Sequence, residues 1–256
     1  HAEDFRLRLL LPVDVPTAQT WLAHHPFDLV ERPIAVDPAT DGWQEAELAE
    51  KPFLHVQSVG HGNRGLAFIS AGGIHEGGVA DDHRRTMQVT LLRSFRTTIA
   101  TGGEPDGLET GALMWRYLLL PFSENLPRSR VFELLASAQS GVSTRQSGAR
   151  PSGFPPLASN GETQASFFEQ LDRRLVISAI APSIDGSGII VRLWNHSSEP
   201  TTDRLRFQRS IVTAVLVNLA EDHDLGSRNI THSQHQVTIT VASRSVATVR
   251  IRFGER

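Results

Sequence analysis

The stretch QVTITVASRSVATVRIRF, residues 236–253, decides the fold class of this chain because its side chains alternate between apolar and polar with a period of two. The apolar positions are Val237, Ile239, Val241, Val249, Ile251 and Phe253. This period is typical of β-strands with one buried face. The short segment Ala242–Ser245 separates the two runs and predicts an antiparallel hairpin.

The same period recurs along the rest of the chain. We expect further strands at Phe5–Leu9, Phe27–Val36, Phe53–Val59, Gly65–Ser70, Thr86–Leu92, Leu113–Leu119, Ile189–Trp194, Arg204–Phe207 and Ile211–Leu219. A second hairpin is expected where Ser166–Leu171 and Arg174–Ile180 flank Asp172 and Arg173. A helical period appears in one segment, where apolar residues recur from Val131 to Ala138 after Pro127.

Many strands and one short helix exclude a doubly wound α/β fold, which needs a helix after nearly every strand. The sequence therefore predicts an all-β chain built as a large antiparallel β-sandwich with one short helix. We expect residues 1–256 to form one sandwich domain, with a possible lobe boundary in 140–165. That segment is rich in Gly, Ser and Pro and has no period, so a long loop and a hinge between lobes both remain open.

Composition limits the partners of the chain. Its 25 basic and 28 acidic residues give a net charge of -3, which makes nucleic acid an unlikely partner because phosphate backbones require clustered positive charge. No apolar run is long enough to span a membrane, so we expect no membrane partner. The lack of cysteine excludes disulfides and thiolate chemistry, and it leaves the compartment open, with the cytoplasm slightly favoured.

The densest polar cluster lies in the glycine-rich stretch Gly72–His83. Within it, His75, Glu76, Asp81 and Asp82 have side chains that can hydrogen-bond sugar hydroxyls or bind a hard cation, and the glycines let a ligand approach the backbone. An ordinary connection between two strands would have the same composition. These four residues are therefore candidates for substrate binding, on a loop.

Tryptophan supplies the other binding signal. Trp194 falls out of phase with its apolar neighbours, and Trp21 and Trp43 have polar surroundings, so each could stack on a sugar or close the edge of a core. We take Trp194 as a further candidate for substrate binding.

No catalytic or metal-binding residue is predicted. His232 and His235 lie three apart at the entry to a strand, which points their side chains to opposite faces. The Gly-x-Ser-x-Gly motif of serine hydrolases is absent, and the glycine-containing segment Asp185–Gly188 is typical of a hairpin turn.

The order of several segments resembles the C-terminal region of glycoside hydrolase family 38 α-mannosidases. The segments that carry this resemblance are Gly65–Ile69 (GLAFI), the glycine-rich turn with Glu76, Gln88–Ser94 (QVTLLRS), Tyr117–Phe122 (YLLLPF), Leu175–Pro182 (LVISAIAP), Ile190–Asn195 (IVRLWN) and Val217–Glu221 (VNLAE). Phe122 stands where the family commonly has histidine, and Trp194 replaces a tyrosine.

The resemblance implies a sandwich of the galactose mutarotase-like supersandwich type. It also implies that zinc and the nucleophilic aspartate belong to an N-terminal catalytic domain of the same polypeptide, against which this chain packs. Cofactors are accordingly expected in that domain and none in this chain. We expect the stretch Gly72–His83 to face the catalytic domain, with His75 and Glu76 closest to the sugar.

Three functions remain open at this stage. The chain is a non-catalytic domain of an α-mannosidase, a free-standing carbohydrate-binding sandwich, or an interaction module without a sugar site. Whether it is part of an enzyme is therefore an open question on the sequence alone.

Overall fold

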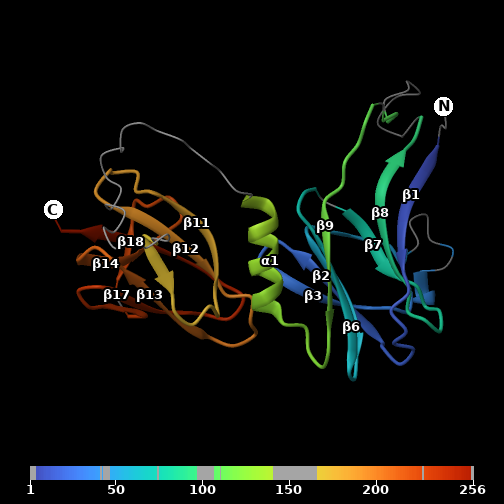
Figure 1. Ribbon diagram of the computed structural model, residues 1–256, viewed down its shortest axis with the longest axis horizontal. Helices are drawn as coiled ribbons and strands as arrows, with labels where there is room; N and C mark the ends of the chain where they lie inside the picture. The colour runs from blue at the N-terminus through green and yellow to red at the C-terminus, as the bar shows by residue number, and fades with distance from the viewer. Residues whose placement is uncertain are drawn as a thin grey trace, which may run out of the picture. The chain divides into compact units, whose positions relative to one another are not determined.

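The computed structural model describes residues 4–40, 42, 47–73, 75–96, 107–109, 111–140, 166–226 and 228–254. The chain divides into two compact units, His1–Gly141 and Val142–Arg256. Every pair of named strands is antiparallel, and the described residues contain one α-helix, so the predicted fold class is confirmed (Figure 1). The strands form two sandwiches, each with its own core. Most of the segment 140–165, where a loop or hinge was expected, lies outside the described residues.

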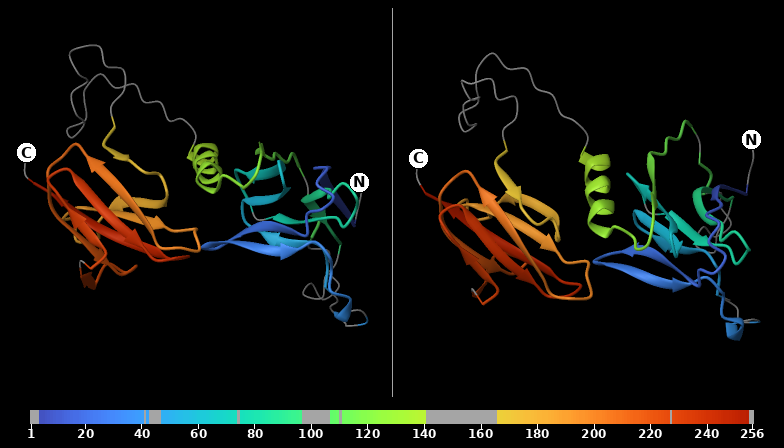
Figure 2. Two further views of the ribbon diagram at one scale, coloured as in Figure 1. Left: turned by 90° about the horizontal axis from the view of Figure 1, so that it is seen from below. Right: turned by 60° about the horizontal axis from the view of Figure 1, so that its bottom comes forward.

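Unit 1 contains two sheets. The four-stranded sheet has the order β1-β8-β7-β4, formed by β1 (Phe5–Leu11), β4 (Lys51–Phe53), β7 (His75–Val79) and β8 (Met87–Ser94). The five-stranded sheet has the order β3-β2-β5-β6-β9, formed by β2 (Thr20–His25), β3 (Asp28–Pro33), β5 (Val56–His61), β6 (Arg64–Ser70) and β9 (Tyr117–Phe122). Figure 2 shows β2 and β3 as a long blue hairpin. A short 3₁₀-helix, Pro38–Thr40, follows β3.

The core of unit 1 lies between these two sheets. Phe53, Met87 and Val89 of the four-stranded sheet pack in one cluster with Ala23 and Phe68 of the five-stranded sheet. Each of these side chains is almost fully buried. Alternation along each strand supplies the inward residues, which explains why a period of two predicted the sandwich.

The helix α1 (Arg128–Ser140) belongs to unit 1 and contacts β6. Its buried side chains are Val131, Phe132 and Leu135. The helical segment predicted from Val131 is therefore confirmed, although it begins three residues earlier and Phe132 adds to the buried face. The N–H group of Val131 donates to the carbonyl of Pro127 at 3.0 Å, and proline is well suited to such a helix start.

Strand β9 forms one edge of the five-stranded sheet and pairs with β6 on one side. Leu118 and Leu119 are exposed although both are apolar, as is Tyr117. The strand predicted at Leu113–Leu119 is correct only from Tyr117 onward, because 112–116 belongs to no named strand, although the carbonyl of Arg116 accepts a hydrogen bond from the N–H of Ala71 at 3.0 Å.

Unit 2 also contains two sheets. One has the order β10-β13-β17-β16, formed by β10 (Phe168–Gln170), β13 (Thr201–Phe207), β16 (Ile230–His232) and β17 (Gln236–Val241). The other has the order β11-β12-β18-β14-β15, formed by β11 (Val176–Pro182), β12 (Ile189–Trp194), β14 (Ile211–Val217), β15 (Asp224–Gly226) and β18 (Val246–Phe253).

The hairpin predicted for residues 236–253 is wrong in its pairing. Strand β17 pairs with β13 and β16, whereas β18 pairs with β12 and β14 in the opposite sheet. Val237, Ile239, Val249 and Ile251 nevertheless share one core cluster. The turn thus carries the chain from one sheet to the other, and both apolar faces are buried against each other across the core.

The second predicted hairpin is also wrong, because β10 pairs with β13 and β11 pairs with β12. The segment between β10 and β11 is organised by Asp203 of β13, which is fully buried. Its carboxylate accepts hydrogen bonds from the N–H groups of Arg174 at 2.9 Å and Leu175 at 3.0 Å. The turn expected at Asp185–Gly188 is confirmed, since it joins the paired strands β11 and β12.

Among the described residues, no helix is both long enough and apolar enough to cross a lipid bilayer.

Candidate functional site

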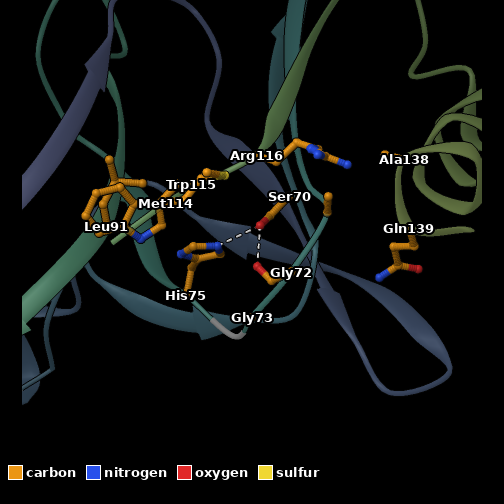
Figure 3. A pocket seen from close by; sticks show the side chains of 11 residues that line it. Ser70, Gly72, Gly73, His75, Leu91, Met114, Trp115, Arg116, Ala138 and Gln139 are labelled. Atoms are coloured by element: carbon orange, nitrogen blue, oxygen red, sulfur yellow. Dashed lines mark hydrogen bonds between the residues drawn. The ribbon is translucent and has the colours of Figure 1, made fainter. Parts of the chain in front are cut away.

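A hollow of about 550 Å³ lies in unit 1 where β6 ends and β7 begins. Its other walls come from residues 114–116, just before β9, and from the last turn of α1. Figure 3 shows Ser70 and His75 on one side of this space and Arg116 and Gln139 on the side of α1. The fold therefore gathers polar side chains that are far apart in sequence.

His75 is held rigidly at the edge of the core. The residue is 8% exposed. Its imidazole stacks on Phe53, with ring centroids 5.6 Å apart, and Phe68 meets it edge-on with centroids 5.9 Å apart. The hydroxyl of Ser70 donates to the carbonyl of Gly72 at 2.6 Å. The same hydroxyl oxygen lies 2.8 Å from His75 Nε2, and His75 Nδ1 lies 3.3 Å from the carbonyl oxygen of Thr90, so both ring nitrogens have a partner.

His55 links the same serine to the helix. Its Nδ1 lies 3.1 Å from the carbonyl oxygen of Ser70, and its Nε2 lies 3.4 Å from the side-chain nitrogen of Gln139. Burial is the main cause that lowers the pKa of His55, and the Ser70 carbonyl opposes the shift. His55 is therefore a neutral bridge between β6 and α1 near pH 7.

Glu76 follows His75 on β7 and points to the opposite face of the sheet, as alternation along a strand requires. It borders a second hollow of about 470 Å³. There its carboxylate lies 3.7 Å from the guanidinium of Arg93, and the hydroxyl oxygen of Thr90 is buried without a hydrogen-bond partner in the described part of the chain. Glu76 therefore lines only the second hollow, whereas His75 lines both.

Asp81 and Asp82 lie beyond the far end of β7 and stabilise the turn into β8. The carboxylate of Asp82 accepts hydrogen bonds from the N–H and hydroxyl groups of Thr86 at 2.9 and 2.7 Å, and Asp81 pairs with Arg85. Burial alone would raise the pKa of Asp82, but the hydrogen bonds from Thr86 lower it. Neither aspartate lines either hollow.

The glycine-rich stretch is not the loop that the sequence predicted, because its middle is strand β7, between β4 and β8. A Cβ atom on Gly77 would lie 2.3 Å from Gln57 Oε1, and one on Gly78 would lie 2.3 Å from the carbonyl oxygen of Ala49. These glycines thus allow neighbouring parts of unit 1 to pack closely against the main chain of β7. A glycine strand has no hydropathy pattern, which is why alternation did not reveal it.

Trp194 lies in unit 2 and is 6% exposed, so it presents no open stacking face. Trp21 is likewise buried, and Trp43 lies outside the described residues. The tryptophan that does line a hollow is Trp115, which sequence reasoning passed over as part of an alternating run. A signal was available: Trp115 and Arg116 adjoin one another directly before a strand.

Histidine and carboxylate groups do not gather into a metal site here. Within the described ranges, no cluster of three or more His, Asp or Glu side chains has the arrangement that could hold a metal ion.

Residues 174–249 match the family model described as the glycosyl hydrolases family 38 C-terminal beta sandwich domain. This range begins just before β11 and ends within β18, so it covers most of unit 2. The chain resembles the C-terminal β-sandwich region of family 38 glycosyl hydrolases.

Similar proteins extend this family 38 resemblance to most of the chain. A putative mannosylglycerate hydrolase from Halalkalibacterium halodurans is 28% identical over 201 residues, which cover 77% of this chain and 20% of that protein. A crystal structure of an α-mannosidase from Enterococcus faecalis V583 superposes with a TM-score of 0.69 at 18% identity, covering 97% of this chain and 26% of that one. A second Enterococcus faecalis structure, of a protein in glycosyl hydrolase family 38, gives a TM-score of 0.65 at 17% identity and the same coverage.

The family 38 sandwich region therefore accounts for the fold of both units. The chain spans about a fifth of the curated relative and about a quarter of each solved chain that it matches. At these identities the two solved structures establish the fold alone.

Proposed function

We propose that this chain is the non-catalytic C-terminal β-sandwich portion of a glycoside hydrolase that acts on α-mannosides. In this proposal it packs against a catalytic domain located elsewhere in the same polypeptide. The match of residues 174–249 to the family 38 sandwich domain carries the proposal. The coverage of relatives supports it, because proteins named for mannoside chemistry are four to five times longer than the part matched by this chain.

The family 38 resemblance implies a zinc-dependent catalytic domain. The described residues of this chain do not fit such a centre, since they include no His, Asp and Glu cluster suited to a metal. We therefore assign zinc and the nucleophile to the proposed catalytic domain, and we assign stability and part of the surrounding surface to this chain.

We also propose that this chain contacts the carbohydrate substrate. His75 and Glu76 border two neighbouring hollows of unit 1, and polar groups in concave sites are typical of sugar recognition. Asp81, Asp82 and Trp194 are not included, because their side chains are engaged in a turn or buried.

The test compares two preparations: the isolated chain, and the longer polypeptide that contains it. We expect the longer polypeptide to hydrolyse 4-nitrophenyl α-D-mannopyranoside and to lose that turnover on chelation of zinc, whereas the isolated chain shows none. Separately produced chain should also co-elute in gel filtration with the remainder of the polypeptide. Turnover by the isolated chain would contradict the non-catalytic assignment.

The same experiment separates the alternative of a free-standing carbohydrate-binding module. Such a module would bind sugar without any catalytic domain present. It would not co-elute with a catalytic region, and it would not change the stability of that region. Absence of co-elution together with normal activity of the truncated enzyme would favour that alternative.

A further inference from the structure

The hollow beside Ser70 has a positive charge and no negative one. Among the 11 residues that line it there is neither Asp nor Glu. Arg116 lines it, and within the described ranges its guanidinium forms no ion pair and no hydrogen bond. An arginine without a carboxylate partner at the wall of a concave site favours an anionic ligand. The volume, about 550 Å³, lies within the range of small-molecule sites.

Backbone donors add to this charge. Gly72 and Gly73 line the same hollow, and their N–H groups donate to no acceptor in the described part of the chain. Gly73 has a φ angle of 80°, in the left-handed region, and a Cβ atom on either glycine would meet nothing within 4 Å. Successive N–H groups in a turn with a left-handed residue form a concavity that binds anions. The open space at both glycines lets a ligand approach them closely.

The remaining walls suit a ligand with hydroxyl groups. The side-chain amide of Gln139 can both donate and accept, and its oxygen accepts no hydrogen bond from the described residues. Trp115 adds an aromatic surface on the side of Leu91, where the apolar face of a polyol can pack (Figure 3). The side chains of His75 and Ser70, which also line the hollow, are hydrogen-bonded to each other, so their positions are set before a ligand binds.

We propose that this hollow is a binding site for a polyhydroxylated carboxylate. The carboxylate binds the guanidinium of Arg116 and the N–H groups of Gly72 and Gly73, while hydroxyl groups bind Gln139. This inference deepens the carbohydrate part of the proposed function and rests on it only for the hydroxyl groups. Its test needs the chain alone, so it fails or succeeds independently of any catalytic domain.

Isothermal titration calorimetry of the full 256-residue chain with D-gluconate tests the proposal. D-sorbitol serves as the matched neutral probe, because it has the same carbon chain without the carboxylate, and acetate serves as a carboxylate without the hydroxyl groups. We expect D-gluconate to bind at least tenfold more tightly than either probe. Arg116→Gln should weaken D-gluconate binding about tenfold, which corresponds to the loss of one charge-assisted contact.

Arg64→Gln is the control variant, because Arg64 is an exposed arginine at the opposite end of β6 and does not line the hollow. It should leave binding unchanged, and thermal unfolding should show that both variants are folded. Equal affinities for D-gluconate and D-sorbitol, equal effects of the two variants, or no heat with D-gluconate at about 20 mM would each overturn the proposal.

Discussion

The side-chain amide of Asn195 donates a hydrogen bond to the main-chain carbonyl of Val241 at 3.1 Å, which joins the end of β12 to the end of β17 in the opposite sheet of unit 2. The same nitrogen reaches the carbonyls of Ala242 at 2.9 Å and Glu199 at 2.8 Å. Asn195 is fully buried. The last residue of the IVRLWN segment that carries the family resemblance is therefore a structural bridge between sheets.

Asn195→Asp should destabilise unit 2 by roughly 3 kcal/mol, because it replaces a donor with a buried acceptor facing three carbonyl oxygens. Urea unfolding followed by circular dichroism would measure the change. Asn63→Asp, in an exposed turn between β5 and β6, is the matched control and should have little effect. Equal stability of the two variants would show that the bridge contributes nothing.

Asp203→Asn tests the turn between β10 and β11. Asp203 accepts hydrogen bonds from the side-chain amide of Gln170 at 2.7 Å and from four main-chain N–H groups. An amide nitrogen in place of either carboxylate oxygen would therefore face hydrogen-bond donors. We expect a loss of about 2–4 kcal/mol in the free energy of unfolding of unit 2. Asp172→Asn, which removes an exposed pairing with Arg204, should cost clearly less. The reverse order in urea midpoints would contradict this assignment.

The stability of unit 1 should depend on pH through His24. Burial, followed by the charges of His55 and His25, lowers the pKa of His24 to about 4. The unfolded chain takes up a proton near pH 6.5, whereas the folded unit does so only near pH 4, so protons favour unfolding between these values. The free energy of unfolding should therefore have its highest value above pH 6.5. It should fall by up to about 3 kcal/mol as the pH drops to 4.

Urea titrations at several values between pH 7.5 and 4 would measure that dependence. The His24 ring lies 5.3 Å from that of Phe132 on α1, so the loss should appear first as weaker packing of the helix. His24→Gln should flatten the decline, and His61→Gln, at an exposed position, should leave it unchanged. A decline of the same steepness in His24→Gln would exclude His24 as its cause.

Gly77→Ala should disrupt unit 1. The added Cβ atom would lie 2.3 Å from Gln57 Oε1 and 2.7 Å from the carbonyl oxygen of Gln88, and a main-chain atom of a central strand cannot move without breaking its ladder. We expect a loss of more than about 3 kcal/mol, measured by thermal unfolding. Gly72→Ala, whose Cβ meets nothing within 4 Å, should be nearly neutral for stability. Equal melting temperatures for the two variants would contradict the close packing of β7.

Alternation predicted most strands and the fold class, because it reports which face of a strand is buried. It does not report the partner of a strand, which is why Val241 and Val249 were assigned to one hairpin although they lie in facing sheets. Close packing of main-chain atoms likewise leaves no mark in hydropathy, so β7 was missed.

The candidate site was predictable only in part. His75 was singled out because a polar cluster is visible locally, whereas Arg116 and Gln139 join it through the pairing of β9 with β6 and the packing of α1. Such long-range contacts depend on the whole topology and have no local signal. Trp194 is buried, and one residue out of phase in a sequence does not distinguish an exposed ring from one buried at the edge of a core.

Among the described residues no strand pairs with the outer side of β9, and this has a practical consequence for producing the chain by itself. The hexapeptide YLLLPF contains no charged residue to discourage a second copy from pairing along it, and Pro121 removes only one N–H donor from the strand. At high concentration the chain should therefore self-associate through this edge. Replacing Leu118 with lysine, as natural edge strands often do, would be the first change to make for keeping it monodisperse.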